Sequence, residues 1–274
     1  MLFSLLYPSF KPKAITFSYD DGVRQDREVI AILRDHHLRG TFNLNAGQSG
    51  EAKFRNDIDC SHLKLEEERS LYEGMEVANH TYSHPHLETL PYEVQLNEYE
   101  KNKEKLERIF GVSCFGSAYP YGTYDATTLQ VLKDLKIHYA RTTQSTYAFH
   151  RPYNWLLWAP TIHHNDPLLQ STLHAFYESD EELALFYLWG HAYEFALQDN
   201  FALLEHFCGD IAQHSEIWSA TNEELYRYIS SAEMLYYRNG EFVNPSPLSV
   251  FLRINDDKIE VKPLSRYAYS EVKQ

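Results

Sequence analysis

The 274-residue chain has few cysteines and no long apolar run. Its three cysteines, Cys60, Cys114 and Cys208, are an odd number without a closely spaced pair. That pattern excludes a disulfide framework or a zinc knuckle and favours a reducing compartment. No stretch approaches the roughly 18 apolar residues that indicate a transmembrane helix, and residues 1–7 lack the positive region and apolar core of a signal peptide. We therefore expect a cytoplasmic protein without a membrane partner.

Basic residues are scarce relative to acidic ones. The chain has 25 Lys and Arg against 39 Asp and Glu, which gives a net charge of -14. An acidic chain without a basic cluster is not expected to bind nucleic acid or an anionic membrane. Tyrosine is abundant, with 21 residues. Aromatic faces can stack on sugar rings, although core and surface packing accounts for most of them.

Helical and strand patterns alternate along most of the chain. Apolar runs and alternation predict strands at residues 13–18, 41–44, 75–78, 114–118, 137–141, 185–188 and 217–220. Apolar periodicity and capping signals predict helices at residues 26–36, 65–72, 91–110, 125–135, 201–214 and 222–234. This alternation indicates an α/β fold with parallel strands covered by helices.

Residues 235–263 follow a different pattern. Asn239-Gly240 and Asp256-Asp257 are turn signals between short apolar runs. They predict antiparallel β-hairpins appended to the parallel part of the fold. Because the sequence contains no linker, internal repeat or low-complexity tract, we predict one domain over residues 1–274.

Chemically reactive residues follow four of the predicted strands. They are Asp20-Asp21, then His80, then residues 119–122 (Tyr-Pro-Tyr-Gly), and finally residues 189–191 (Trp-Gly-His). In a βα barrel the carboxyl ends of the strands share one face, and that face carries the chemistry. We therefore expect these four clusters to meet.

The Asp pair and a His pair together predict a metal site. Adjacent side chains in an extended chain point in different directions, so one Asp can bind a metal while the other takes a proton; an Asp-Asp-Gly turn is the alternative. On a helical turn, His80 and His84 would face the same way, which is a metal-ligand spacing. Two surface histidines in a chain with 14 are the alternative. As metal ligands, Asp21, His80 and His84 would leave coordination positions open for water and substrate, as in a metal-dependent hydrolase.

A further histidine, His191, ends a strongly apolar strand beside Trp189. A histidine in that place can act as a general acid, and Glu194, three residues later, could orient it. A satisfied core histidine is the alternative. Residues 163–166 (His-His-Asn-Asp) could contribute a substrate-binding or supporting group.

Four segments resemble the motifs of the polysaccharide deacetylases with the NodB homology domain, carbohydrate esterase family 4. Residues 16–22 (Thr-Phe-Ser-Tyr-Asp-Asp-Gly) look like the first motif, Thr-Phe-Asp-Asp-Gly, with two residues inserted. Residues 80–84 match the second, His-(Ser/Thr)-x-x-His. Residues 118–122 (Ala-Tyr-Pro-Tyr-Gly) are similar to the third, Arg-x-Pro-Tyr, and residues 188–191 (Leu-Trp-Gly-His) approximate the last, Leu-x-His. The resemblance covers about residues 13–232.

This resemblance implies a distorted (β/α)7-type barrel of parallel strands, here with the C-terminal β-hairpin extension. It also implies a metal-dependent hydrolase that removes N-acetyl groups from an amino sugar, oligosaccharide or polysaccharide, cleaving a carbon–nitrogen bond other than a peptide bond. The cofactor would be one divalent metal, Zn²⁺ first, with Co²⁺, Ni²⁺ and Mn²⁺ as alternatives. The implied roles are metal binding by Asp21, His80 and His84, general base for Asp20, general acid for His191, and an oxyanion site at the Tyr121 backbone N–H.

Two positions depart from the family pattern. Ala118 stands where the family usually has the Arg that tethers the catalytic base. Arg141 ends the next predicted strand, and we predict that it replaces the missing Arg by forming an ion pair with Asp20. The Asp that orients the acid has no clear counterpart either, and Glu194 or Asp166 could replace it.

Two other functions stay open. One is hydrolysis of an O-acetyl ester or a cyclic amide on the same barrel, and the other is a catalytically silent sugar-binding protein. Ala118 favours the silent protein, whereas the presence of both Asp20 and His191 opposes it, since sugar binding needs neither. The residues predicted to contact a carbohydrate substrate are Tyr121, Trp189, Glu194, Trp158 and His164.

Overall fold

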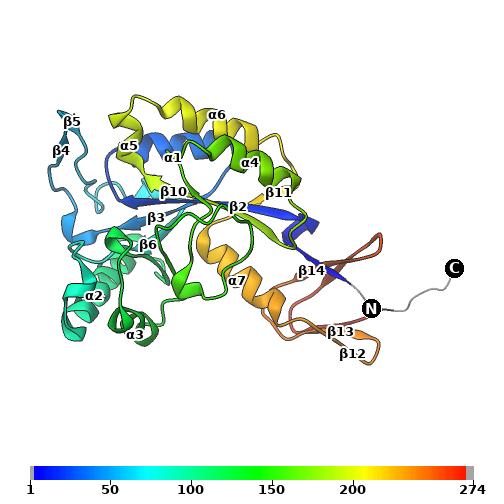
Figure 1. The fold of residues 1–274 in the computed structure, drawn as a ribbon. Helices are drawn as coiled ribbons and strands as arrows, with labels where there is room; N and C mark the ends of the chain where they lie inside the picture. The colour runs from blue at the N-terminus through cyan, green and yellow to red at the C-terminus, as the bar shows by residue number, and fades with distance from the viewer. Residues whose placement is uncertain (1–2, 270–274) are drawn as a thin grey trace.

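A curled sheet of parallel strands forms the centre of the molecule (Figure 1). The structure is a computed structural model that describes residues 3–269, so residues 1–2 and 270–274 of the predicted domain lie outside it. The strand order is β8-β7-β6-β3-β2-β10-β9, and β11 pairs with the start of β2. The strands are β2 (Lys13–Asp21), β3 (Gly40–Leu44), β6 (Glu76–Asn79), β7 (Gly116–Ala118), β8 (Tyr139–Arg141), β9 (Ile162–His163), β10 (Ala184–His191) and β11 (Ile217–Ser219).

The segment between β8 and β10 curls the sheet toward closure. Trp158 forms a parallel bridge with Arg141 at the end of β8. A few residues later, Thr161 donates its N–H to the carbonyl of Tyr187, at 3.0 Å, and β9 pairs with β10. The predicted distorted barrel of parallel strands is therefore confirmed.

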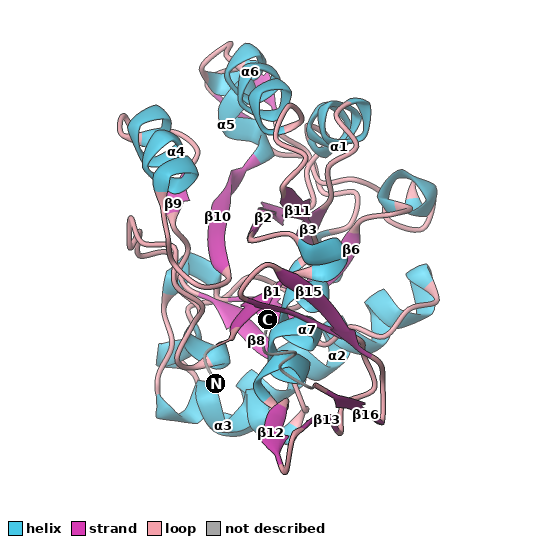
Figure 2. Cartoon of the chain, turned by 90° about the vertical axis from the view of Figure 1, so that its right-hand side faces the viewer, coloured by secondary structure: helices cyan, strands magenta, loops and turns pink. Residues whose placement is uncertain are grey.

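Helices cover both sides of the sheet (Figures 1 and 2). On one side lie α1 (Asp26–Asp35), α4 (Leu169–Glu178), α5 (Ala192–Leu197) and α6 (Phe201–Ile211). On the other lie α2 (Tyr92–Phe110), α3 (Ala126–Asp134) and α7 (Asn222–Glu233). No helix within residues 3–269 combines the length and apolar character that crossing a bilayer requires.

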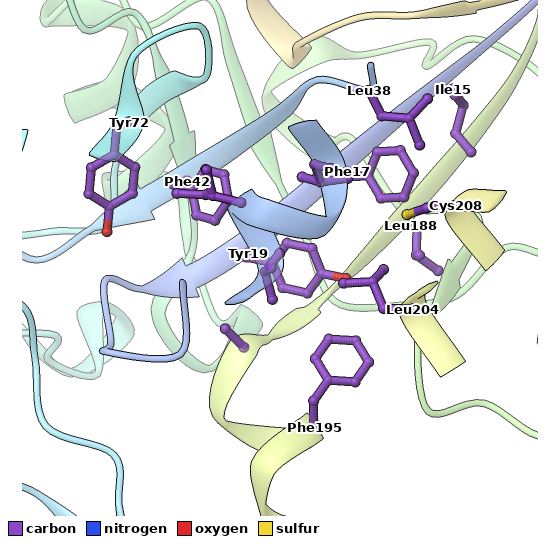
Figure 3. Close-up of a cluster of buried hydrophobic side chains, with 14 of the residues drawn as sticks. Ile15, Phe17, Tyr19, Leu38, Phe42, Tyr72, Leu188, Phe195, Leu204 and Cys208 are labelled. Carbon is purple, nitrogen blue, oxygen red and sulfur yellow. The ribbon is translucent and has the colours of Figure 1, made fainter. Parts of the chain in front are cut away.

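The largest hydrophobic core lies between the sheet and the first group of helices (Figure 3). Phe17 and Tyr19 of β2 project into it and are fully buried, as is Phe42 of β3. Phe17 meets Phe207 of α6 edge-on, with ring centroids 6.1 Å apart. Strands covered on both faces read as continuous apolar runs, which is why β2 is so apparent in the sequence. The three cysteines are all buried and free.

The C-terminal segment forms the predicted antiparallel hairpins. These are β12 (Tyr236–Arg238) with β13 (Glu241–Asn244), and β14 (Val250–Ile254) with β15 (Asp257–Val261). Two more strands extend them, since β16 (Ser265–Ala268) pairs with β13 and β1 (Ser4–Leu6) pairs with β14. Asn239 and Gly240 both have positive φ, as a tight two-residue hairpin turn requires. The second turn is Asn255-Asp256, one residue before the predicted position.

One predicted helix is wrong and several elements were missed. Residues 65–72 form only a short 3-10 turn, Arg69–Tyr72. Side-chain contacts to α1 hold this segment, because Glu68 pairs with Arg27 at 2.7 Å and the Tyr72 hydroxyl donates to Asp26. Such tertiary contacts override the local helical propensity. The missed elements are α4, α5, β9, β1, β16 and a small hairpin formed by β4 (Phe54–Arg55) and β5 (Ile58–Asp59).

Candidate active site

The four reactive clusters meet at one cavity of about 490 Å³. It lies at the carboxyl ends of β2, β6 and β10, the expected place for a site in a βα barrel. The residues that line it are Asp20, Asp21, Lys53, Arg55, His80, His84, Tyr119, Tyr121, Thr143, Trp189, His191 and Tyr193.

Asp21, His80 and His84 form a compact group of potential metal ligands. The Nε2 atoms of His80 and His84 each lie 3.7 Å from Asp21 Oδ1. Within the described part of the chain, this buried oxygen has no hydrogen-bond partner. His80 Nδ1 lies 2.8 Å from the carbonyl of Ala118, to which it can donate. That bond leaves the Nε2 lone pair directed at the group, so a carboxylate oxygen and two imidazole nitrogens fit a divalent metal.

The route of the chain from His80 to His84 differs from the prediction. Residues 81–86 run as an irregular loop rather than a helical turn. Thr81 and His84 have positive φ values of 63° and 57°, and these bends bring the two rings to a centroid distance of 4.8 Å. Burial, followed by the charge of His80, lowers the pKa of His84 to about 4. A neutral imidazole is the form that binds metal.

Asp20 is buried and held by two partners. Its Oδ1 accepts a hydrogen bond of 2.8 Å from Asn43 of β3, and its Oδ2 forms an ion pair with Arg141. This is the ion pair that the sequence predicted. Arg141 is fully buried and lies over the Trp189 ring, with its Cζ 4.3 Å from the centroid. Although burial raises the pKa of Asp20, Arg141, His80 and His191 together hold it below its ordinary value, so the group is a carboxylate.

His191 faces Asp20 from the end of β10. Its Nε2 lies 4.0 Å from Asp20 Oδ2, and its Nδ1 lies 3.4 Å from Oε1 of Glu194 in α5. Glu194 Oε2 also accepts the backbone N–H of His191 at 3.0 Å. Burial disfavours the charged imidazole, but Glu194, Asp21 and Asp20 outweigh it and raise the pKa of His191. The ring can therefore carry a proton into the cavity.

Known proteins resemble this chain in sequence and fold. A sequence profile of the polysaccharide deacetylases matches residues 8–140. A peptidoglycan-N-acetylglucosamine deacetylase from Bacillus cereus is 30% identical over 110 residues, which cover 39% of this chain and 36% of that protein. A chitin deacetylase from Colletotrichum lindemuthianum is 26% identical over 137 residues, covering 50% and 53%. The Xyl-CE4 domain of a multidomain xylanase from the hindgut metagenome of Trinervitermes trinervoides has the same fold, with a TM-score of 0.52 at 19% identity, covering 80% and 91%.

The matched segment, just under half of the chain, supports the resemblance to the polysaccharide deacetylase family that the motifs indicated. The chain spans about half or less of the length of these curated relatives. The family profile includes Asp20, Asp21 and the His pair but stops before Arg141 and His191. Solved structures with this fold include a mutant of a family pseudoenzyme with restored activity, with a TM-score of 0.50 at 14% identity, covering 80% and 69%. The fold alone therefore does not show whether a protein is catalytically active. Activity has to be inferred from the side chains at the site.

Glu194 lies behind His191 and is not among the residues that line the cavity. The Nε2 atoms of His163 and His164 approach its Oε2 to 3.2 and 3.1 Å. Burial raises the pKa of Glu194, but these two imidazoles and His191 lower it far more, and the group stays ionised. His163, His191 and Glu194 could together also hold a metal by their spacing. The arrangement corrects the prediction that Glu194 contacts substrate and instead makes it the partner of His191.

His164 and Trp158 do not line the cavity either. His164 is buried against Gly190, where an added Cβ would lie 2.1 Å from the His164 Nδ1. Trp158 is 2% exposed and packs edge-on against Tyr139, since it belongs to the segment that closes the barrel. Both predicted substrate contacts are therefore corrected to packing positions. Tyr121 and Trp189 do line the cavity, as expected.

The other candidate for orienting the acid, Asp166, has a different role. It accepts a hydrogen bond of 2.8 Å from the hydroxyl of Tyr147 and caps the turn before α4 through the Leu168 N–H. His86, two residues after His84, stacks on Tyr121 at a centroid distance of 3.9 Å and is not one of the grouped ligands.

Several cavity residues were missed in the sequence. Asn43 supports Asp20 directly, but the sequence shows it only as one residue of an alternating strand. Lys53 and Arg55 approach from the β4–β5 hairpin, and Tyr193 comes from α5. Lys53 and Arg55 are two residues apart and precede the turn residues Asn56-Asp57. That spacing puts both side chains on one face of a strand, and it was the signal in the sequence that could have placed them together.

Proposed function

We propose that this protein is a metal-dependent hydrolase that removes an N-acetyl group from an amino sugar or an oligosaccharide or polysaccharide that contains one. Its metal is one divalent ion, Zn²⁺ first, with Co²⁺, Ni²⁺ and Mn²⁺ as alternatives, held by Asp21, His80 and His84. One observation carries the proposal. A buried carboxylate held by a cation and an imidazole that lies 3.4 Å from a second carboxylate face each other, 4.0 Å apart, beside the three ligands.

The base side of the reaction follows from the contacts of Asp20. When bound, a divalent metal polarises an acyl carbonyl and lowers the pKa of a water molecule. Asp20 accepts the proton of that water at Oδ2 as the water oxygen attacks the acyl carbon. Asn43 and Arg141 fix the direction of the carboxylate and keep it ionised. Asp20 can therefore act as a base rather than as a fourth ligand.

The acid side follows from the contacts of His191. Its Nε2 donates a proton to the sugar nitrogen as the carbon–nitrogen bond breaks, which releases acetate and a free amine. Glu194 lies beside Nδ1 and so directs Nε2 toward the cavity. The backbone N–H of Tyr121, in the loop after β7, would bind the negative oxygen that develops on the acyl group. Tyr121 has a φ of 58°, which turns this loop sharply at the cavity.

The carbohydrate preference rests on the aromatic rim as well as on the family. The Tyr121 side chain is 55% exposed and is stacked face to face with His86, with an interplanar angle of 6°. A rigid exposed ring of this kind offers a flat face to a sugar ring. The buried Trp189 forms the floor beside Arg141.

The test combines metal analysis with a substrate panel. Purified protein should contain about one divalent metal and should release acetate from N-acetylglucosamine oligomers. Acetylated xylan and allantoin represent the ester and cyclic-amide alternatives. Asp20→Asn and His191→Ala should abolish release while metal stays bound. A protein that binds sugar oligomers but cleaves none of the panel would instead be the silent sugar-binding relative.

A further inference from the structure

The β4–β5 hairpin presents two cations to the active-site cavity. Asn56 and Asp57 have φ values of 47° and 62°, the two positive values that a tight hairpin turn needs. Alternate side chains on a strand point to opposite faces, so Lys53 and Arg55 share one face and Phe54 takes the other. Phe54 is 66% exposed, and both cations line the cavity. In Figure 1 the hairpin stands at the left edge, beyond the ends of β2 and β3.

The base of the hairpin is firmly attached. Asp59 forms an ion pair with Arg24, and its carbonyl accepts a hydrogen bond of 2.7 Å from Gln25. Cys60, which is buried, donates its N–H to the carbonyl of Lys53 at 2.8 Å. The backbone that carries the two cations is therefore held in place by the fold before any ligand arrives.

Among the described residues, neither cation has a direct ion-pair partner, although the charge of Lys53 is one of those that lower the pKa of Asp21. Within residues 3–269, neither Lys53 nor Arg55 forms an ion pair or a side-chain hydrogen bond, and the Arg55 Nε is buried without a partner. Arg55 is held only by the face of Tyr193, with its Cζ 4.4 Å from the ring centroid. Arg141, by contrast, forms an ion pair with Asp20. The charges of Lys53 and Arg55 are thus available to a ligand in the cavity.

The two cations at the cavity contrast with the acidic character of the chain as a whole. A chain with a net charge of -14 repels anionic ligands at long range. Two cations without a direct ion pair in the described part of the chain add positive charge to a cavity that also contains Asp20 and Asp21, and so oppose that repulsion at short range. A guanidinium with its donors free is shaped to bind a carboxylate or a phosphate through paired hydrogen bonds.

We propose that Lys53 and Arg55 form a subsite for an anionic substituent, so that the preferred substrate is an acidic N-acylated sugar rather than a neutral one. The anion is a carboxylate or a phosphate on the sugar that lies against the β4–β5 hairpin. This inference rests on the proposed function for the identity of the ligand as an acyl sugar. The cationic subsite itself rests on the hairpin geometry.

Binding and turnover are measured separately, so that the two proposals can fail separately. Zinc-loaded Asp20→Asn protein is titrated calorimetrically with N-acetylmuramic acid (carboxylate), N-acetylglucosamine 6-phosphate (phosphate) and neutral N-acetylglucosamine oligomers. The anionic sugars should bind about tenfold or more tightly than the neutral one, as expected for one charge-assisted contact, and added salt should weaken them selectively. Whichever of the two anionic sugars binds better identifies the substituent.

Variants then assign the preference to the hairpin. In Lys53→Gln/Arg55→Gln the ratio of anionic to neutral affinity should fall toward one, and Arg55→Lys should restore part of it. Lys64→Gln removes one positive charge outside the cavity, at an exposed residue paired with Glu67, and should keep the ratio. Equal binding of neutral and anionic sugars, no binding of the anionic sugars, or a preference that survives in the double variant would overturn the subsite. Selective binding without acetate release by the wild-type protein would overturn the hydrolase and leave the subsite standing.

Discussion

Replacing Arg141 by methionine would leave the Asp20 carboxylate buried without its cation. Arg141 is fully buried and Asp20 is 2% exposed, so solvent would compensate the lost guanidinium only poorly. Asp20 Oδ1 would keep its hydrogen bond from Asn43, whereas Oδ2 would lose its partner. Removing one member of a buried ion pair costs about 3–5 kcal/mol. Because methionine fills much of the arginine volume, we expect the free energy of unfolding to fall by about that amount with little added cavity cost.

Urea unfolding of the metal-free protein, followed by tryptophan fluorescence, measures this loss at equal m-values. Arg27→Met is the matched control, since Arg27 pairs with Glu68 on the surface and should lose much less stability. Asp20→Asn in the Arg141→Met background removes the stranded charge and should recover part of the loss.

A decrease of less than about 1 kcal/mol in the free energy of unfolding of Arg141→Met would refute the reasoning, because a buried unpaired carboxylate should destabilise the protein by more than that. An Asp20→Asn/Arg141→Met protein no more stable than Arg141→Met would refute it as well. In that case packing against Trp189, not charge, would explain the role of Arg141.

Three further outcomes test other parts of the molecule. His84→Ala should reduce bound metal well below one equivalent by elemental analysis, and full retention would disprove the ligand set. Glu194→Gln should lower kcat on the order of 10²-fold with little change in KM, because His191 loses its orientation but substrate contacts remain; a change in KM alone would contradict that role. Burial raises the pKa of Glu76 to about 7, so its contribution to stability falls as pH rises from about 4.5 to 7. Glu76→Gln should remove this slope from urea midpoints measured across that range, and an unchanged slope would count against it.

The sequence predicts the strands and their ends well because two strong signals coincide there. β2 and β10 are buried on both faces, and their apolar runs leave little alternative to a strand. Each run ends in polar residues, Asp20-Asp21 and His191, which would be costly to bury in an apolar core. The parallel arrangement then requires these residues to meet, and the structure brings them to one cavity.

Features built from weak local signals and distant contacts could not be predicted. The β4–β5 hairpin has two-residue strands and is fixed by Asp59 contacting the start of α1. The failure of the helix at residues 65–72 likewise depends on partners in α1 that lie about 40 residues earlier in the sequence. Glu194 was visible near His191, but its histidine partners come from β9 and the loop after it, which a single sequence does not connect to α5.

The replacement of the usual tethering Arg shows how a family site can be kept while its residues move. In the parallel register of β7 and β8, Ala118 is the direct partner of Arg141. The two Cα atoms therefore stand at the same level of the barrel on adjacent strands. The long guanidinium side chain of Arg141 reaches Asp20 from β8, beside an alanine at residue 118. Arginine at both positions would put two cations beside one carboxylate, so the alanine and the displaced arginine depend on each other, and Ala118 is by itself no evidence for a silent protein.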